Sequence, residues 1–217
     1  MEKDKKVGLL PNDTPTAGLC PSRAIFAGHR PAAHPVLTTA RLLLRPYQSA
    51  DADDFFAVLD ASRARLKYSF PDRLRAVPTR AAVPPQFALF ADDWRRGRFY
   101  VFGIWLRESG TYLGDICIMP QAGGQAEIGY YLAEQFEGHG YAREALAALV
   151  EFGFGPPVRA RRLLIRCFAD NPRAQAVARA VGFESSEADE APAPWFRFNF
   201  WDSRPAIRHF YRSVSGG

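Results

Sequence analysis

Hydrophobic and polar positions repeat with two different periods along this chain, and the changes of period divide it into strands and helices. Alternating or continuous apolar runs predict strands at residues 36–46, 99–107, 112–120, 126–133, 161–169 and 195–201. Apolar residues at helical spacing predict helices at 49–66, 84–96, 141–154 and 172–181. The tail RPAIRHFYRSV (204–214) is expected to form one more short helix. The order β-α-α-β-β-β-α-β-α-β indicates an α/β fold in which three consecutive strands precede a βαβ portion.

The first 35 residues differ from the rest of the chain. Five prolines interrupt them, and their apolar residues show no period. We therefore expect a flexible N-terminal arm at 1–35, one folded domain at 36–201 and a C-terminal tail at 202–217, while an arm that serves as a pro-segment or a partner-binding strand remains an alternative.

Charge narrows the partners only slightly. The 28 Lys and Arg residues against 23 Asp and Glu residues give a net charge of +5. This balance favours an anionic partner and does not distinguish among a phosphorylated cofactor, a nucleic acid and an anionic membrane. The densest basic run, VRARRLLIR at 158–166, alternates with apolar residues as a strand does, so nucleic-acid binding is not favoured as the main role.

Cysteine usage and hydropathy predict the compartment. The three cysteines lie far apart and form no CxxC pair, so no disulfide framework or metal site is expected. No apolar run approaches the roughly 20 residues that cross a bilayer, and the N-terminus does not resemble a signal peptide. We expect a cytoplasmic protein without a membrane partner.

The segment EIGYYLAEQFEGHGYAREAL (127–146) carries the most specific signal. A predicted strand leads into a loop with Gly138 and Gly140, and a predicted helix begins directly after them. Glycines let a backbone approach a ligand closely, and the first turn of a helix offers free N–H groups to a pyrophosphate. An ordinary strand–helix turn needs the same glycines. The lysine of a Walker A loop is absent, and Arg143 stands where a dinucleotide fingerprint needs a third small residue.

Residues Gln135 to Gly140 resemble the Q/R-x-x-G-x-G/A signature of the GNAT superfamily of N-acetyltransferases. LTTARLLLRP resembles the opening strand of that family, and RCFADNPRAQAVARAVGFE (166–184) resembles its fifth strand, fourth helix and closing Gly-Phe. The resemblance covers about residues 36–201 and is nearest to the ribosomal-protein and polyamine N-acetyltransferase branch, the RimJ/RimL type. It implies a mixed, mainly antiparallel sheet with splayed central strands, flanked by helices.

The resemblance also implies acetyl-CoA as the co-substrate and assigns residues to it. The backbone of Tyr130, Tyr131 and Leu132 is expected to bind the pantetheine arm and polarise the thioester, and Asn171 is expected to contact the arm while capping a helix. The pyrophosphate is expected on the loop and the first helical turn, formed by Glu137, Gly138, His139, Gly140, Tyr141, Ala142 and Arg143.

The implied reaction is direct attack on the thioester by a primary amine, of a small molecule or a protein N-terminus, in a ternary complex. A base must take the amine proton. Glu127 is the first candidate and Asp115 the second, although Glu127 in a surface ion pair is an equal alternative. Ala178 stands where many members carry a tyrosine that protonates the leaving thiolate. The alternatives are that another phenol or solvent protonates the thiolate, or that the chain is a catalytically weak acyl-CoA-binding regulatory domain. The predicted aromatic strand at 195–201 is a candidate for a homodimer contact.

Overall fold

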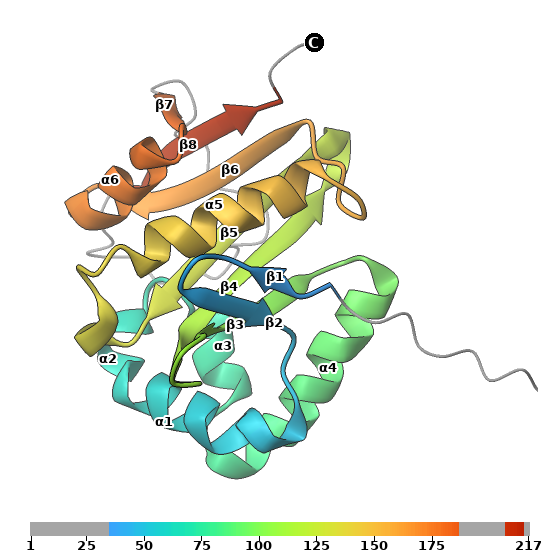
Figure 1. Ribbon diagram of the computed structural model, residues 1–217, viewed down its shortest axis with the longest axis vertical. Helices are drawn as coiled ribbons and strands as arrows, with labels where there is room; N and C mark the ends of the chain where they lie inside the picture. Colours follow the sequence, from blue (N-terminus) through green and yellow to red (C-terminus); the bar gives the residue numbers. More distant parts are fainter. Residues whose placement is uncertain (1–34, 187–206, 215–217) are drawn as a thin grey trace, which may run out of the picture. The chain divides into compact units, whose positions relative to one another are not determined.

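The strands of the described residues, 35–186 and 207–214, form one mixed sheet in the computed structural model (Figure 1). Their order across the sheet is β1-β2-β3-β4-β5-β6-β8-β7. Neighbours are antiparallel except β5 and β6, which are parallel. The strands are β1 (Leu37–Thr38), β2 (Leu42–Arg45), β3 (Tyr100–Leu106), β4 (Tyr112–Gln121), β5 (Gln125–Leu132), β6 (Arg162–Phe168), β7 (Glu184–Ser186) and β8 (Ile207–Ser213). This is the mainly antiparallel sheet that the resemblance implies.

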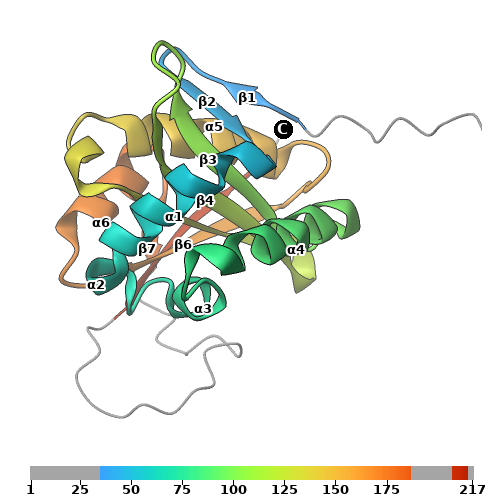
Figure 2. The ribbon, with the colours of Figure 1, turned by 90° about the horizontal axis from the view of Figure 1, so that it is seen from below.

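Helices cover both faces of this sheet. Figure 2 shows α5 and α3 on opposite sides of β4 and β6. The α-helices are α1 (Ala52–Ala61), α2 (Arg63–Leu66), α3 (Pro71–Ala76), α4 (Val83–Arg96), α5 (Tyr141–Phe154) and α6 (Pro172–Ala180). Short 3-10 turns are η1 (Ser49–Asp51), η2 (Arg80–Ala82), η3 (Ala122–Gly124) and η4 (Glu134–Phe136). None of the helices in the described ranges has the length and apolar character to cross a membrane.

Each face of the sheet has its own hydrophobic core. On the α5 and α6 face, the fully buried Leu146 and Leu149 pack with Ile116 and Ile128 of the central strands. On the opposite face, α1 buries Phe55 in a cluster with residues of α2, α4 and the sheet. Alternate residues of one strand therefore enter different cores. This alternation decides which side chains of β5 face which set of helices.

The strongly periodic segments formed the expected elements. The predicted strands at 99–107, 112–120, 126–133 and 161–169 are confirmed as β3 to β6, and the helices at 84–96, 141–154 and 172–181 as α4, α5 and α6. The predicted helix at 49–66 is divided into η1, α1 and α2. The predicted strand at 36–46 is divided into β1 and β2 by a turn, in which the N–H of Thr39 donates to the Leu42 carbonyl at 3.0 Å. Helix α3 was not predicted.

The prediction of a helix in the tail is wrong. Ile207–Ser213 forms β8, which pairs along the whole of β6, with Phe210 opposite Ile165. Ile207, Phe210 and Tyr211 do have helical spacing, but a long-range partner strand supplies the backbone hydrogen bonds instead. The predicted arm at 1–35 and the predicted strand at 195–201 lie outside the described residues, except for the last residue of the arm.

Candidate active site

The two parallel strands, β5 and β6, separate part of the way along their length. Their pairing ends at Ile128 opposite Ile165. β5 nevertheless continues to Leu132, and β6 to Phe168. The sheet is therefore open between the carboxyl halves of its two central strands, which is the splayed arrangement that the sequence resemblance implies.

Backbone groups of β5 face this opening at alternate residues. The N–H of Ala133 donates to the Leu113 carbonyl of the β4 side at 2.8 Å. In an antiparallel ladder every second residue bonds to the same neighbour, so Tyr131 turns its peptide groups toward β4. Tyr130 and Leu132 turn theirs toward the opening. Two of the three residues expected to bind the pantetheine by their backbone are thus placed to do so, and Tyr131 is not.

The glycine turn after β5 forms an open helix N-terminus. Gly138 and Gly140 both have φ of 81°, a left-handed conformation that favours glycine. Gly140 precedes α5, and no side chain caps this helix. A Cβ on Gly138 would meet no atom within 4 Å, so the space above the turn is empty. The N–H groups of the first turn have no partner inside the helix, and they carry the positive end of its dipole.

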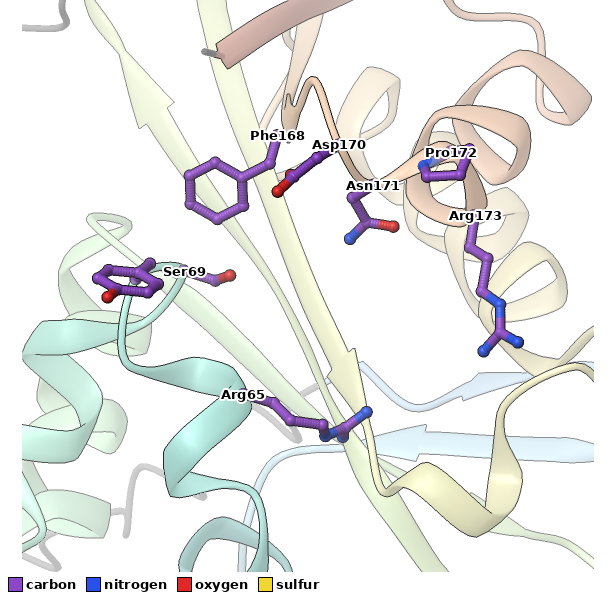
Figure 3. A pocket seen from close by; sticks show the side chains of 8 residues that line it. Arg65, Ser69, Phe168, Asp170, Asn171, Pro172 and Arg173 are labelled. Atoms are coloured by element: carbon purple, nitrogen blue, oxygen red, sulfur yellow. The ribbon is translucent and has the colours of Figure 1, made fainter. Parts of the chain in front are cut away.

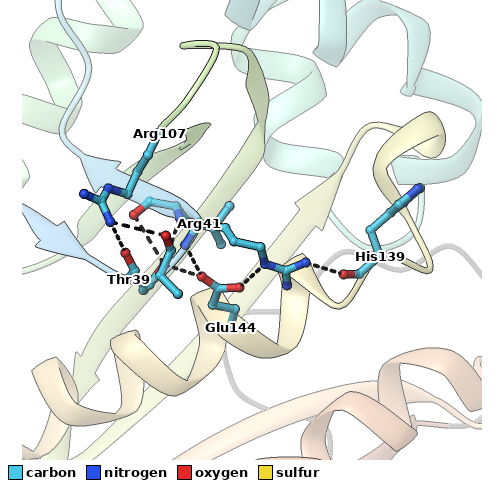
Figure 4. A network of polar contacts seen from close by, with 7 residues as sticks. Thr39, Arg41, Arg107, His139 and Glu144 are labelled. Carbon is cyan, nitrogen blue, oxygen red and sulfur yellow. Dashed lines mark hydrogen bonds and ion pairs between the residues drawn. The ribbon is translucent and has the colours of Figure 1, made fainter.

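Glu144 in the first turn of α5 anchors this loop to the first hairpin of the sheet (Figure 4). Its carboxylate accepts hydrogen bonds from the Thr39 hydroxyl (2.5 Å), the Arg41 N–H (2.8 Å) and Arg41 Nε (2.7 Å). Arg41 also donates to the His139 carbonyl at 3.0 Å. Burial alone would raise the pKa of Glu144, but the bonds from Thr39 and Arg41 hold it below its usual value. These residues position the turn, and no local sequence pattern marks them as part of the site.

A cavity of about 610 Å³ lies beside the opening (Figure 3). One wall comes from α2 and the segment after it, and the other from the end of β6 and the start of α6. Its lining residues are Arg65, Tyr68, Ser69, Phe168, Asp170, Asn171, Pro172 and Arg173. Asn171 also caps α6, since its Oδ1 accepts from the Ala174 N–H at 3.0 Å. The predicted capping role of Asn171 is confirmed, and the residue is in reach of a ligand in the cavity.

Glu127 lies beside the point where β5 and β6 separate. Its carboxylate accepts from Arg166 Nε at 2.7 Å and from Gln121 Nε2 at 3.0 Å. Its side chain is 11% exposed. Burial raises the pKa of this carboxyl, while the charge and hydrogen bond of Arg166 act in the opposite direction. The residue is in an ion pair, as the alternative interpretation held, but the pair is largely buried at the opening.

Asp115 of β4 is more deeply buried than Glu127. It is fully inaccessible and forms an ion pair with Arg73 of α3, and Tyr47 donates to its carboxylate at 3.2 Å. Burial raises the pKa of Asp115, against the opposing effect of Arg73. Asp115 does not reach the opening, because its side chain is inaccessible and its carboxylate is bonded to Arg73 and Tyr47.

Three tyrosines, Tyr130, Tyr131 and Tyr141, are the candidates to replace the phenol that is missing at Ala178. Ala178 is fully buried in the core under α6. The hydroxyls of Tyr130 and Tyr131 are buried, and burial raises the pKa of each phenol, which makes both weaker proton donors. Tyr141 lies under the guanidinium of Arg41, 4.5 Å from it. Among residues 35–186 and 207–214, no cluster of three His, Cys, Asp or Glu residues is arranged for a metal ion.

Comparisons with known proteins agree with this geometry. Residues 41–184 match the family model of the acetyltransferase (GNAT) domain. YoaA, an uncharacterized N-acetyltransferase of Bacillus subtilis, is 26% identical over 69% of this chain and 83% of its own length. The ribosomal-protein-serine acetyltransferase of Escherichia coli is 41% identical over 27% of this chain and 32% of its own. The solved RimL structure, a ribosomal L7/L12 alpha-N-protein acetyltransferase in complex with coenzyme A, has the same fold: TM-score 0.69 at 19% identity, over 83% of this chain and 98% of that one.

Proposed function

The chain belongs to the GNAT acetyltransferase family, and from that premise we propose how it binds acetyl-CoA and how it transfers the acetyl group. It is an acetyl-CoA-dependent N-acetyltransferase. The observation that carries the proposal is the end of pairing between β5 and β6 at Ile128, directly upstream of an uncapped helix N-terminus. An extended ligand with a diphosphate at one end fits this combination.

The pantetheine arm lies in the opening between the two strands. Its amides pair with the outward backbone groups of Tyr130 and with the N–H of Leu132, whose carbonyl accepts from Arg65. The diphosphate lies on the N–H groups from Gly138 to Arg143, where Arg143 is exposed and adds a positive charge. Asn171 contacts the arm from the opposite wall. Acetyl-CoA supplies the activated acetyl group.

Glu127 takes the amine proton. The amine nitrogen attacks the thioester carbon, the C–S bond breaks, and the electron pair leaves with the CoA thiolate. Glu127 is beside the end of the β5–β6 pairing, and a raised pKa brings a carboxylate closer to the range in which it accepts a proton from an ammonium group. Arg166 and Gln121 fix its orientation.

The acceptor is a primary amine of a small molecule or a protein N-terminus. The ribosomal-protein-serine acetyltransferase among the relatives supports a peptide acceptor. A second candidate function, a catalytically weak acyl-CoA-binding domain, is favoured by Ala178 and by the burial that raises the phenol pKa of Tyr130. Turnover with a panel of amines and N-terminal peptides separates the two functions.

The first experiment is a calorimetric titration with acetyl-CoA, and with ATP and NAD as controls. We expect binding of acetyl-CoA alone, and a folded sample that binds none of the three would refute the proposal.

The second experiment tests the base. Glu127→Gln should reduce kcat by about a hundred-fold or more with little change in acetyl-CoA affinity. The wild-type rate should fall as the pH drops through the pKa of Glu127, and this limb should disappear in the variant. Glu151→Gln, on the exposed side of α5, is the matched control. An unchanged rate in Glu127→Gln would exclude it as the base.

A further inference from the structure

The carboxylate of Glu137 lies between two arginines from opposite walls of the cavity. Its Oε1 accepts from Arg65 Nη1 of α2, and its Oε2 accepts from Arg173 Nη1 of α6 at 3.1 Å. Both arginines line the cavity (Figure 3). Glu137 directly precedes Gly138, so this bridge is adjacent to the open helix N-terminus.

Arg65 has a second contact that joins it to the opening. Its Nη2 donates to the Leu132 carbonyl at 2.8 Å, which is one of the β5 groups left without a strand partner. One guanidinium thus connects α2, the edge of β5 and the glycine turn. A planar guanidinium with several donors binds a phosphate at least as well as a carboxylate, because its geometry matches two oxygens at once.

We propose that Arg65 and Arg173 bind the diphosphate of coenzyme A, and that Glu137 holds both arginines in the unliganded protein until the phosphates replace it. This inference rests on the proposed function, since it names further residues of the same cofactor site. Glu137 acts as an internal competitor. It lowers the affinity for CoA, and it keeps two cations oriented toward the cavity.

The exposure of the bridge suits an exchange of partners. The side chains of Arg65 and Glu137 are 34% and 31% exposed, and that of Arg173 is 82% exposed. Ion pairs with this exposure are weak, so a ligand with two negative charges can replace a single carboxylate. Once displaced, Glu137 reaches solvent by rotation of its side chain and is not left buried and unpaired.

The test compares CoA with pantetheine, which lacks the phosphates, by calorimetry for CoA and ligand-observed NMR for pantetheine. Arg65→Gln should weaken CoA binding about ten-fold without weakening pantetheine binding. Glu137→Gln should strengthen CoA binding about two- to five-fold and leave pantetheine unchanged. Lys67→Gln and Glu134→Gln, exposed neighbours of the same charge type, are the matched controls.

Each outcome has one meaning. Weaker CoA binding in Glu137→Gln would overturn the competitor role and indicate that Glu137 only shapes the loop. Unchanged CoA affinity in Arg65→Gln, or an equal change for pantetheine, would overturn the phosphate contact. If the wild-type protein binds CoA, either of these results overturns only the role of the arginines and Glu137, and the proposed function still holds. A wild-type protein that binds no CoA would refute the proposed function itself.

Discussion

Glu144→Gln tests whether the first hairpin holds the glycine turn in place. Both the Thr39 hydroxyl and the Arg41 N–H donate to Oε1 of Glu144, and Arg41 Nε donates to Oε2. Glutamine keeps one carbonyl oxygen, so it can retain the first two bonds. It places an amide opposite Arg41 Nε and loses the third. The variant therefore removes one charge-assisted bond and one negative charge from the first turn of α5.

The expected loss of unfolding free energy is about 1–2 kcal/mol. A hydrogen bond to a charged group contributes about 1.5–3 kcal/mol, but Arg41 is 48% exposed, so solvent screening reduces its contribution to about 1 kcal/mol or less. A carboxylate at a helix N-terminus adds about 0.3–1 kcal/mol through the helix dipole. Urea denaturation at pH 7 measures the difference. Glu151→Gln, on the exposed side of the same helix, should change stability by less than about 0.5 kcal/mol.

The pH dependence separates charge from packing. The pKa of Glu144 is lowered in the folded protein, so its charge stabilises the fold above the unfolded pKa of about 4.3. That contribution is lost as the pH falls through the lower, folded pKa. The difference between wild type and Glu144→Gln should be constant near neutral pH and should shrink below about pH 4.3. A difference that persists unchanged to the lowest pH at which both proteins fold would refute this reasoning.

Three further predictions concern the opening and the core beneath it. Gly138→Glu should abolish acetyl-CoA binding, because the new side chain enters the empty space above the glycine turn. Circular dichroism should show an intact fold. A variant with wild-type affinity would contradict the assignment of the diphosphate site to this turn. Arg73→Met should cost about 3–5 kcal/mol in urea denaturation, since it leaves Asp115 buried without its partner, and a much smaller loss would mean that Asp115 becomes protonated or hydrated. Asn171→Ala should cost about 0.5–2 kcal/mol through loss of the α6 cap, whereas Asn171→Asp should retain most of the stability.

The fold was predictable wherever a local pattern and its tertiary environment agree. Helix α5 and strands β3 to β6 have long, regular apolar periods, and their boundaries lie within two residues of the predicted ones. Strand β8 was missed because its few apolar residues fit helical spacing equally well. The hydrogen bonds that decide between a helix and a strand come from β6, whose residues are 39 to 51 positions away from their partners in the sequence. No local signal contains that information.

The same distinction holds for the site. The glycine turn is contiguous, so the sequence predicts Gly138 and Gly140 together with the helix that follows them. Arg65 lies 72 residues before its partner Glu137 in the sequence, and Arg41 lies 103 residues before its partner Glu144. Arg41 lies in a predicted strand and Arg65 in a predicted helix, and isolated arginines in such segments are ordinary surface residues by pattern alone. Their role depends on the partner that the fold provides.

The alternation of β5 bears on the choice between the two candidate bases. Glu127 and Gly129 share a face of the strand, and a Cβ on Gly129 would lie 3.4 Å from Phe70 and 3.5 Å from Cys117, on the side of α3. Helix α5, at whose N-terminus we propose that the diphosphate binds, covers the opposite face. In the proposed arrangement, the thioester is held from the α5 side and presents its carbonyl through the opening to an amine on the α3 side. Glu127 stands at that passage with 11% of its side chain exposed, whereas Asp115 is sealed under α3 by Arg73. This difference supports the proposal that Glu127 is the base, whereas Asp115 pairs with Arg73 and holds α3 against the sheet.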